Sequence, residues 1–216
     1  KLGTPQSDDR LVYENKQEKD WGFSGSVTDD GRYLIITVWQ GTDRKNRVYY
    51  IDLAAGNGEV VKLLDNFDAR YGLIDNDGPL FWFFTDKDAP RGRVIAIDIT
   101  QPDPSHWKDV IPQADEPLEN VSCVGGQFIA EYLRDAQSCV RRFALDGTPL
   151  GDLELPGLGS VGGFGGRRDE DETFYTFTSF ATPATIYRYD VPSGRSAIWR
   201  QPKVCLLYTY PSPRDS

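Results

Sequence analysis

The sequence has no methionine, one histidine and three cysteines among its 216 residues. No apolar run approaches the ~18 residues that a membrane-spanning helix needs. The longest runs, 34–39 and 80–84, have the length of strands. The 24 basic residues are outnumbered by 33 acidic ones, giving a net charge of −9, which argues against the basic face that a nucleic acid partner requires. We therefore expect neither a nucleic acid partner nor a membrane-spanning segment.

The three cysteines, Cys123, Cys139 and Cys205, are odd in number and contain no C-x-x-C spacing. This pattern disfavours a disulfide framework and a zinc site, and it favours a reducing compartment. The first residues do not have the basic-then-apolar pattern of a signal peptide. We expect a cytoplasmic protein without a metal or other cofactor, with the periplasm as the alternative because the natural start of the protein could be missing.

Apolar residues make up 39% of the chain and aromatic residues 12%, which is enough for a sizeable core. The chain opens at Lys1 in the middle of a pattern and has no initiator methionine. We expect either that the natural start has been removed or that the sequence is an internal piece of a longer protein.

Two markers repeat along the sequence at nearly the same period. Apolar stretches closed by aspartate end at Asp52, Asp98, Asp146 and Asp190, which are 46, 48 and 44 residues apart. The second marker opens an apolar run and keeps the same step; it consists of Asp30-Gly31, Asp77-Gly78, Gly125-Gly126 and Asp171-Glu172. A fixed period of this length indicates a repeat architecture.

Each repeat reads as four short strands rich in Val, Ile, Tyr, Phe and Trp, separated by Gly, Asp, Asn and Pro. The first strand of each repeat is rich in small residues, as expected where strands crowd around an axis. The pattern predicts an all-β protein, a β-propeller fragment of about four four-stranded blades. The expected divisions are the end of a preceding blade at 1–20, blades at 21–66, 67–113, 114–156 and 157–204, and a tail at 205–216.

The two ends of the chain do not fit the repeat. Arg10–Tyr13 reads as the outermost strand of a preceding blade, which favours a cut from a larger ring over a closed four-bladed ring. Residues 205–216 belong to no further blade and read as a foreign tail, with a native linker as the alternative. Four blades alone would leave two blade faces uncovered, which predicts poor solubility or oligomerisation.

Several phrases occur in an order typical of one family. The most specific are Val61-Lys62-Leu63-Leu64-Asp65-Asn66-Phe67 and Phe174-Tyr175-Thr176-Phe177-Thr178-Ser179-Phe180. Over residues 1–204 the sequence resembles the propeller domain of the prolyl oligopeptidase family. The resemblance implies a serine peptidase that cleaves oligopeptides after proline, in which a seven-bladed propeller caps an α/β-hydrolase domain and excludes folded proteins.

The catalytic elements of that family are not found in this sequence. The nucleophile elbow needs G-x-S-x-G, and both near matches, at 22–25 and 159–162, are off by one residue. The only histidine, His106, follows a turn and is expected to be solvated. We therefore expect the chain alone to be inactive, with the hydrolase domain as its missing partner and proline-containing oligopeptides as ligands of the whole enzyme.

One site residue follows from the resemblance. Cys123 aligns with a cysteine on an inner propeller strand that faces the substrate cavity and makes some members sensitive to thiol reagents. The alternative interpretation is a small buried core residue. Both remain open at this point.

Four other motifs have structural explanations that we prefer. The G-x-G-x-x-G match at 157–162 lacks a following helix and reads as glycines of a first strand. Asp75–Gly78 reads as a β-turn, not a calcium loop, because the twelfth position of that loop would be Asp86 instead of Glu. Glu170–Glu172 reads as a solvated hairpin tip. Asn120-Val121-Ser122 is a glycosylation sequon that matters only in a secreted protein.

Two rival functions remain. A stand-alone propeller that binds other proteins is the alternative, although the Gly-His and Trp-Asp signatures of WD repeats are missing. A propeller enzyme with a metal on its axis, such as a lactonase, would need Asp, Glu, Asn or His on several first strands. These strands instead contain mostly Gly, Ser, Val and Cys.

Overall fold

A computed structural model describes residues 3–56 and 58–203 of the chain. These residues form four antiparallel sheets of four strands each. Within the described ranges, the helical segments are two short 3-10 turns, η1 (Gln6–Asp8) and η2 (Pro104–His106). No helix there has the length and apolar character needed to cross a bilayer.

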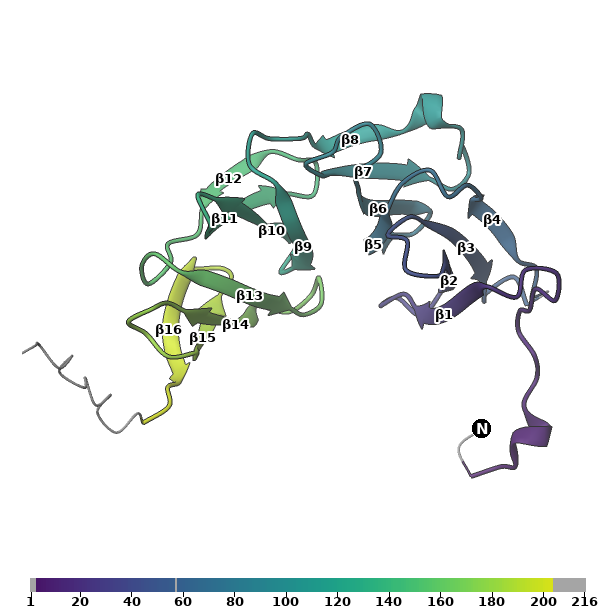
Figure 1. The fold of residues 1–216 in the computed structure, drawn as a ribbon, viewed down its shortest axis with the longest axis horizontal. Helices are drawn as coiled ribbons and strands as arrows, with labels where there is room; N and C mark the ends of the chain where they lie inside the picture. The colour runs from purple at the N-terminus through teal and green to yellow at the C-terminus, as the bar shows by residue number, and fades with distance from the viewer. Residues whose placement is uncertain (1–2, 57, 204–216) are drawn as a thin grey trace, which may run out of the picture. The chain divides into compact units, whose positions relative to one another are not determined.

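The chain divides into two compact units between Leu118 and Glu119. The first unit contains two sheets (Figure 1). The first sheet has strands β1 (Trp21–Val27), β2 (Tyr33–Gln40), β3 (Asn46–Asp52) and β4 (Val61–Leu64). The second sheet has strands β5 (Tyr71–Asp77), β6 (Leu80–Thr85), β7 (Arg93–Asp98) and β8 (Lys108–Ile111).

The second unit also contains two sheets. The third sheet has strands β9 (Leu118–Val124), β10 (Gln127–Arg134), β11 (Gln137–Ala144) and β12 (Pro149–Asp152). The fourth sheet has strands β13 (Ser160–Gly165), β14 (Glu172–Thr178), β15 (Thr185–Asp190) and β16 (Arg195–Arg200). In all four sheets the strands lie in chain order, so each sheet is a meander built from one sequence repeat.

The repeated aspartates terminate strands by accepting backbone hydrogen bonds. Asp52 Oδ1 accepts from the N–H of Ala54, Asp98 Oδ1 from that of Thr100, and Asp146 Oδ1 from that of Thr148, each at 2.9 Å. Asp190 accepts from the N–H of Ser193 at 2.9 Å. An aspartate side chain that bonds the backbone two or three residues later closes a turn, which explains why the residue recurs at the end of the third strand.

The core of the first unit lies between its two sheets. Tyr33 and Tyr50 of the first sheet pack against Phe81 of the second in edge-to-face contacts, with ring centroids 5.0 and 5.9 Å from that of Phe81. Tyr33 and Phe81 are at most 1% exposed. Buried aromatic pairs in this geometry contribute beyond their buried area, so they fix the two sheets face to face.

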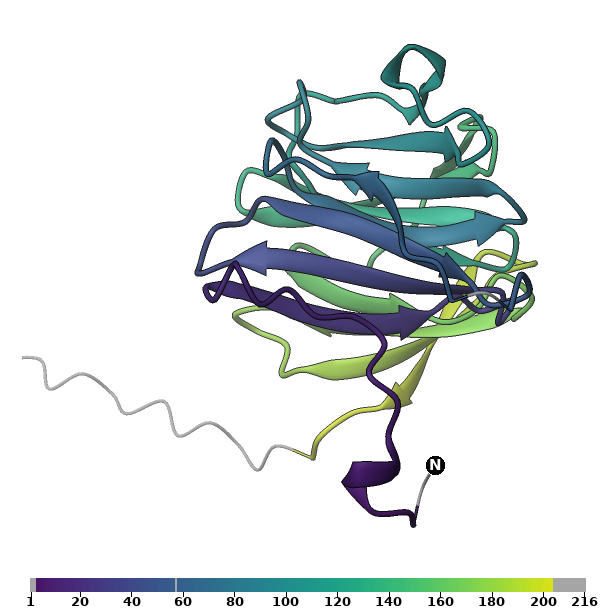
Figure 2. The same ribbon diagram turned by 90° about the vertical axis from the view of Figure 1, so that its right-hand side faces the viewer.

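The outer face of the first sheet packs against the N-terminal segment. Tyr13 contacts Phe23 and Tyr49 edge to face, at centroid distances of 5.4 and 5.8 Å. Farther toward the N-terminus, η1 lies apart from the sheets of this unit in both views (Figures 1 and 2). One of the two faces expected to be uncovered is thus partly covered by the chain itself.

The core of the second unit contains a stack of three rings. Phe164 and Tyr175 lie 4.7 Å apart at 19°, and Tyr175 and Tyr187 lie 5.2 Å apart at 13°. Phe164 is fully buried and has a φ of +55°, in the left-handed region that side chains disfavour. A register shift between Gly163 and Gly165 accompanies it. The bulge turns the Phe164 ring into the stack.

Polar groups connect the first strand of a sheet to the preceding sheet at two places. The Asn46 side chain donates to Tyr71 O at 3.0 Å and accepts from Tyr71 N–H at 2.7 Å. Ser138 Oγ accepts from the N–H of Val161 at 3.0 Å, and the Ser138 N–H donates to the carbonyl oxygen of Gly159 at 2.9 Å. Both residues lie near the start of the third strand of their sheet, so a two-sided polar contact recurs where consecutive sheets meet within a unit.

The sequence predicted the four four-stranded sheets, and the four sheets fall within the four expected blades. The exact domain boundaries stay a prediction, as does the assignment of 1–20 to a preceding blade. Arg10–Tyr13 is not a strand in the structure, because a lone segment has no partner strand to pair with; its Tyr13 ring packs on the first sheet instead. The tail at 205–216 lies outside the described residues.

Two glycines at the first strands are crowded by residues of their own sheet. A Cβ at Gly22 would overlap the ring of Trp39, and one at Gly159 would overlap the carbonyl oxygen of Thr178. Trp39 lies directly across from Gly22 in the first sheet. At these two positions the crowding comes from the same sheet, not from the neighbouring one.

Candidate functional site

The first strand of each sheet is an edge strand. In the first sheet, residues 24–27 of β1 are exposed, and in the fourth sheet most of β13 is exposed. Their side chains are small, so backbone and hydroxyl groups dominate these edges. Such strands can form the wall of a chamber, but they supply no nucleophile paired with a base.

Cys123, the predicted site residue, lies on β9, the first strand of the third sheet. It is 6% exposed and is outside any disulfide. Side chains alternate along a strand, so Cys123 points to the face opposite that of Val124, which belongs to the core of the second unit. The strand position fits the resemblance and the burial fits a core residue, so the cavity-lining role stays a prediction.

A buried carboxylate lies close to this strand and was not predicted. Glu131 on β10 is 7% exposed, and its Oε1 accepts a hydrogen bond of 2.9 Å from the Asn120 side chain on β9. Burial raises the pKa of Glu131 above its usual range, and the Asn120 bond offsets part of that rise. A single glutamate in an apolar strand gives no sequence signal, because only the fold reveals its burial.

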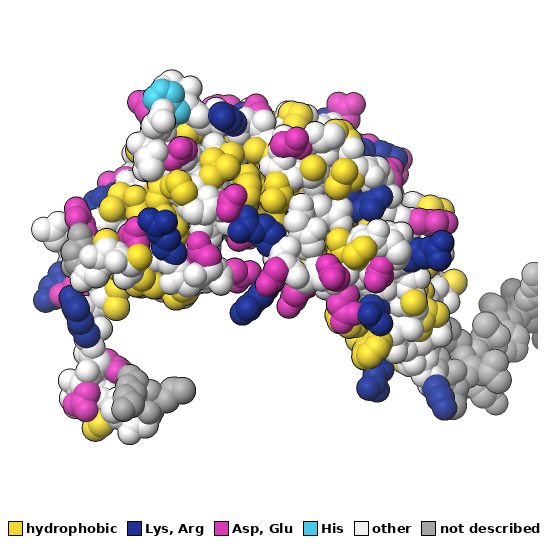
Figure 3. Space-filling view, turned by 180° about the vertical axis from the view of Figure 1, so that it is seen from behind, with side chains coloured by type: hydrophobic (Ala, Val, Ile, Leu, Met, Phe, Trp, Pro, Cys, Tyr) yellow, Lys and Arg dark blue, Asp and Glu magenta, His cyan; other side chains and the backbone are white. Residues whose placement is uncertain are grey.

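The lone histidine lies at the end of a short turn. His106 ends the η2 turn and is exposed, with the Asp103 side chain accepting from the Ser105 N–H at 2.8 Å. The cyan side chain lies at the surface in Figure 3. Ser105 donates its hydroxyl to Asp103, so the nearby serine is used to cap a turn.

The glycine motif at 157–162 continues into β13 and no helix follows it in the structure. The phosphate-binding use of such a motif needs a helix N-terminus, so these are strand and loop glycines, as preferred from the sequence.

The Asp75–Gly78 motif runs from the end of β5 into the hairpin turn before β6, with Gly78 in that turn at a φ of +53°. The Asn76 side chain donates to Asp30 at 2.8 Å and to the carbonyl oxygen of Gly78. Among the described residues, no group of three or more His, Cys, Asp or Glu side chains could hold a metal. The hairpin turn at Gly78 agrees with the β-turn interpretation for the end of the motif.

The two remaining sequence motifs also lie on hairpin structure. Glu170 accepts from the N–H of Arg167 at 2.9 Å in the β13–β14 turn, and Glu172 forms an ion pair with Arg188 across the sheet. Asn120 of the sequon lies within β9 and is bound to Glu131. Because the Asn120 side chain donates a hydrogen bond to the buried Glu131, it has a structural role in the sheet.

One charged cluster in the first sheet was missed by sequence reasoning. The Arg47 guanidinium lies between the rings of Trp21 and Phe67, 4.4 Å from each centroid. Arg47 and the Tyr49 hydroxyl both donate to Asp65 Oδ1, at 2.6 and 2.5 Å. Burial alone would raise the pKa of Asp65, but these bonds hold it below its usual range. The cluster ties β1 and β3 to the segment that follows β4.

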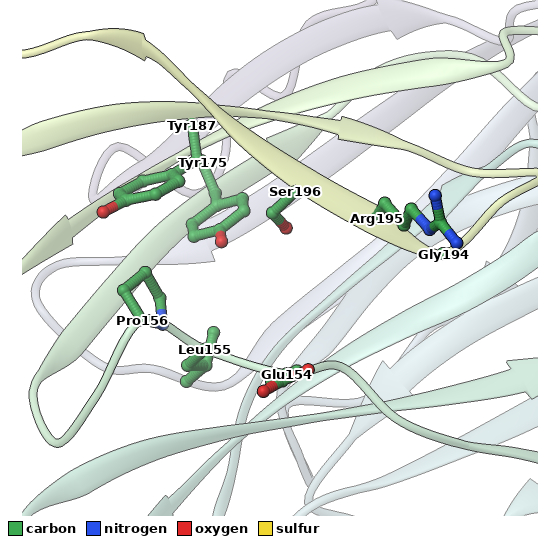
Figure 4. Close-up of a pocket in the computed structure, with 8 residues that line it drawn as sticks. All are labelled: Glu154, Leu155, Pro156, Tyr175, Tyr187, Gly194, Arg195 and Ser196. Atoms are coloured by element: carbon green, nitrogen blue, oxygen red, sulfur yellow. The ribbon is translucent and has the colours of Figure 1, made fainter.

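A pocket of about 410 Å³ opens in the second unit (Figure 4). It is lined by residues 154–156 of the link between β12 and β13, by Tyr175 and Tyr187, and by residues 194–196 at the start of β16. Aromatic, hydroxyl, acidic and basic groups meet there. Sequence reasoning did not find it, because its walls come from segments about forty residues apart.

Charges are distributed without a dominant basic region on the surface seen in Figure 3, where acidic and basic side chains alternate. This agrees with the net charge of −9. Four meander sheets of four strands, each built from one repeat and each beginning with an edge strand, define the class of the protein as a β-propeller domain.

Comparison with known proteins identifies the kind of propeller. Residues 1–202 match the family described as the prolyl oligopeptidase, N-terminal beta-propeller domain. The chain belongs to this family.

Curated relatives include prolyl endopeptidases of Elizabethkingia miricola and Elizabethkingia meningoseptica, which are 38% and 37% identical over 204 residues. These matches cover 94% of this chain and 28% of each relative. Prolyl oligopeptidase A of Galerina marginata is 33% identical, with 97% of this chain and 29% of the relative covered. The chain thus spans little more than a quarter of the length of these relatives.

Solved structures agree with these matches. A structure from a study of two prolyl endopeptidases and their inter-domain dynamics superposes with a TM-score of 0.85 at 34% identity, covering 93% of this chain and 29% of that one. Prolyl oligopeptidase B of Galerina marginata bound to a 35mer substrate superposes at 0.88 and 30% identity, covering 96% and 30%. Oligopeptidase B of Leishmania major, at 0.77 and 16% identity, shares the fold.

Proposed function

We propose that this chain forms part of the propeller of a serine-type prolyl oligopeptidase and restricts access of peptides to its active site. The observation that carries the proposal is the match of residues 1–202 to the N-terminal propeller domain of that family. The relatives named as prolyl endopeptidases are more than three times as long as the matched segment. Their additional length is where we place the catalytic domain of the whole protein.

The chemistry of the chain fits this division of labour. Serine peptidase catalysis requires a nucleophile, a general base and an oxyanion hole within hydrogen-bond reach of one another. His106, the only histidine in the sequence, is exposed on a turn whose neighbouring serine is bound to Asp103. We therefore expect no peptide hydrolysis by the 216-residue chain alone.

The test compares this chain with the protein extended through its own coding sequence. Both are assayed with a blocked Gly-Pro coumarin amide, and the extended protein also with Pro replaced by Ala. We expect the extended protein to release coumarin after proline, to prefer Pro over Ala, and to be silenced by an organophosphorus reagent specific for active serines. Post-proline cleavage by the short chain, or none by the folded extended protein, would overturn the proposal.

We also propose that Cys123 lines the peptide-accessible cavity of the whole protein. Support comes from its place on the first strand of its sheet and from the resemblance described above. Only an accessible thiol reacts, so a bulky maleimide added to the whole protein should slow peptide hydrolysis. Cys123→Ser should abolish this inhibition, whereas Cys139→Ser, the matched control from β11, should leave it intact. If maleimide inhibited the Cys123→Ser variant as strongly as the parent, the Cys123 thiol would not line the cavity and the core interpretation would hold.

A reducing compartment, the cytoplasm, is the proposed location. Cys123 and Cys139 are both outside disulfides, and the total of three cysteines leaves one unpaired in any pairing. Fractionation of cells that produce the whole protein would test this; recovery from the periplasm would contradict it.

A further inference from the structure

The pocket of Figure 4 contains two opposite charges that are not engaged elsewhere. The Glu154 carboxylate and the Arg195 guanidinium both line it, and neither forms a hydrogen bond or an ion pair with another described residue. Figure 4 shows them on separate parts of the wall, Glu154 on the β12–β13 link and Arg195 at the start of β16. Charges that remain apart in this way can each engage an opposite charge on one ligand.

The pocket also contains a rigid aromatic wall. Tyr187 lines it and stacks on Tyr175, which stacks in turn on the buried Phe164. Tyr175 is 1% exposed and Tyr187 is half-buried. A ring held by two others behind it loses little conformational freedom when a ligand packs against it, so Tyr187 is suited to receive a flat or cyclic group.

The Tyr175 hydroxyl marks the back of the pocket. It is fully buried and has no hydrogen-bond partner of normal geometry. Burial raises the pKa of Tyr175, and the approach of the Ser196 hydroxyl offsets part of the rise, although the two groups do not meet as a full bond. Buried hydroxyls are nearly always hydrogen-bonded. A ligand group that contacts Ser196 would bring the Ser196 and Tyr175 hydroxyls into a full hydrogen bond.

We propose that this pocket binds a short zwitterionic peptide, with its carboxylate on Arg195, its free amino group on Glu154 and a ring-bearing residue against Tyr187. A guanidinium recognises a carboxylate through two parallel bonds, which a lone hydroxyl or amide does not supply. The volume of about 410 Å³ falls in the range of small-ligand pockets and accommodates a dipeptide. Proline is the smallest residue that supplies a ring, so a peptide of the form Xaa-Pro is the simplest ligand.

Binding in this pocket does not require peptidase activity, because the pocket is formed within the second unit of this chain. Binding can therefore be measured on the 216-residue chain itself. A failure of the peptidase proposal would leave the binding result unaffected, and the reverse also holds.

The test uses Ala-Pro as the probe and follows the ¹⁵N-labelled chain by NMR. We expect saturable shifts concentrated at residues 154–156, 187 and 194–196. Glu154→Gln and Arg195→Gln should each weaken Ala-Pro binding by about tenfold, since each removes a charge-assisted bond. Glu119→Gln and Arg200→Gln remove exposed charges from β9 and β16 and are the matched controls; both should bind as the parent does.

Blocked peptides assign each charge to its partner. Acetyl-Ala-Pro lacks the amino group that would pair with Glu154, so it should bind Glu154→Gln and the parent equally well. Ala-Pro amide lacks the carboxylate that would pair with Arg195, so it should bind Arg195→Gln and the parent equally well. Ala-Ala should bind more weakly than Ala-Pro. The absence of saturable shifts, or binding of acetyl-Ala-Pro as tight as that of Ala-Pro, would overturn the proposal; the second result would indicate a site for simple organic anions.

Discussion

The β9–β10 turn contains two adjacent glycines whose surroundings differ. Gly125 and Gly126 have φ values of +59° and +69°, so both adopt a left-handed conformation that other residues disfavour. A Cβ at Gly125 would overlap Val191 Cγ1, whereas a Cβ at Gly126 would meet nothing within 4 Å. Alanine substitutions at these two positions therefore distinguish the stability lost to backbone strain from the stability lost to steric overlap.

We expect Gly126→Ala to lower the free energy of unfolding by about 1 kcal/mol through conformation alone. Gly125→Ala should lower it by about 2–4 kcal/mol, because overpacking adds to the same strain. Urea unfolding followed by circular dichroism measures both. Equal losses for the two variants would show that Val191 moves aside without cost.

The buried Glu131 makes stability depend on pH. Burial raises the folded-state pKa of this carboxyl above its unfolded value, so the folded state holds the proton more tightly. The contribution to stability is fully present below the unfolded-state pKa and is lost as the pH rises through the folded-state pKa.

Glu131→Gln keeps an acceptor for Asn120 and removes the titrating group. At neutral pH the variant should be more stable than the parent by an amount on the order of 1 kcal/mol, and the difference should vanish in acid. Urea midpoints across this pH range give the measurement, with the exposed Glu119→Gln as control. A variant less stable than the parent at neutral pH would contradict the assignment.

For strands and turns, the sequence predicts the structure where a residue acts on backbone groups close to it in the chain. The closing aspartates were recognisable because each bonds a backbone N–H two or three residues later, and local chemistry of this kind repeats with the blade. The Arg47–Asp65 cluster and the Glu154–Arg195 pocket were not recognisable. They depend on which segments the fold brings together, and a single sequence gives no sign of that.

The hydrogen bonds between Asn46 and Tyr71, which connect the first two sheets, should contribute to the free energy of unfolding. Asn46 satisfies both the N–H and the C=O of Tyr71, and both residues are buried. Asn46→Ala leaves two buried backbone groups unpaired and should lower the free energy of unfolding by about 3 kcal/mol. Gln40→Ala, an exposed amide in the same hairpin, should change it by less than about 0.5 kcal/mol. A loss for Asn46→Ala as small as that for Gln40→Ala would show that water replaces the Asn46 side chain.

At the scale of the whole molecule, the fourth sheet has an apolar outer face. Phe174, Ile186 and Trp199 lie on it with exposures of 37%, 38% and 55%, and Phe174 contacts Trp199 edge to face at 5.5 Å. A contiguous exposed apolar surface promotes association. We propose that a further sheet of the propeller covers this face in the whole protein.

We expect the 216-residue chain to self-associate through this face in a concentration-dependent manner. Trp199→Lys combined with Ile186→Lys should shift its sedimentation toward monomer, because two charges would have to be buried in any pairing of these faces. Leu158→Lys, which replaces a residue that is 77% exposed, should not. A chain that stays monomeric at all concentrations would contradict this expectation.

We propose that this propeller restricts which substrates reach a post-proline peptidase site in the whole protein. The most direct test gives the whole protein one proline-containing sequence in two forms, as a free flexible peptide and as an exposed loop of a folded domain. We expect cleavage of the free peptide, no cleavage of the folded domain, and cleavage of the loop sequence once it is released as a peptide. Equal cleavage rates for the two forms would contradict it.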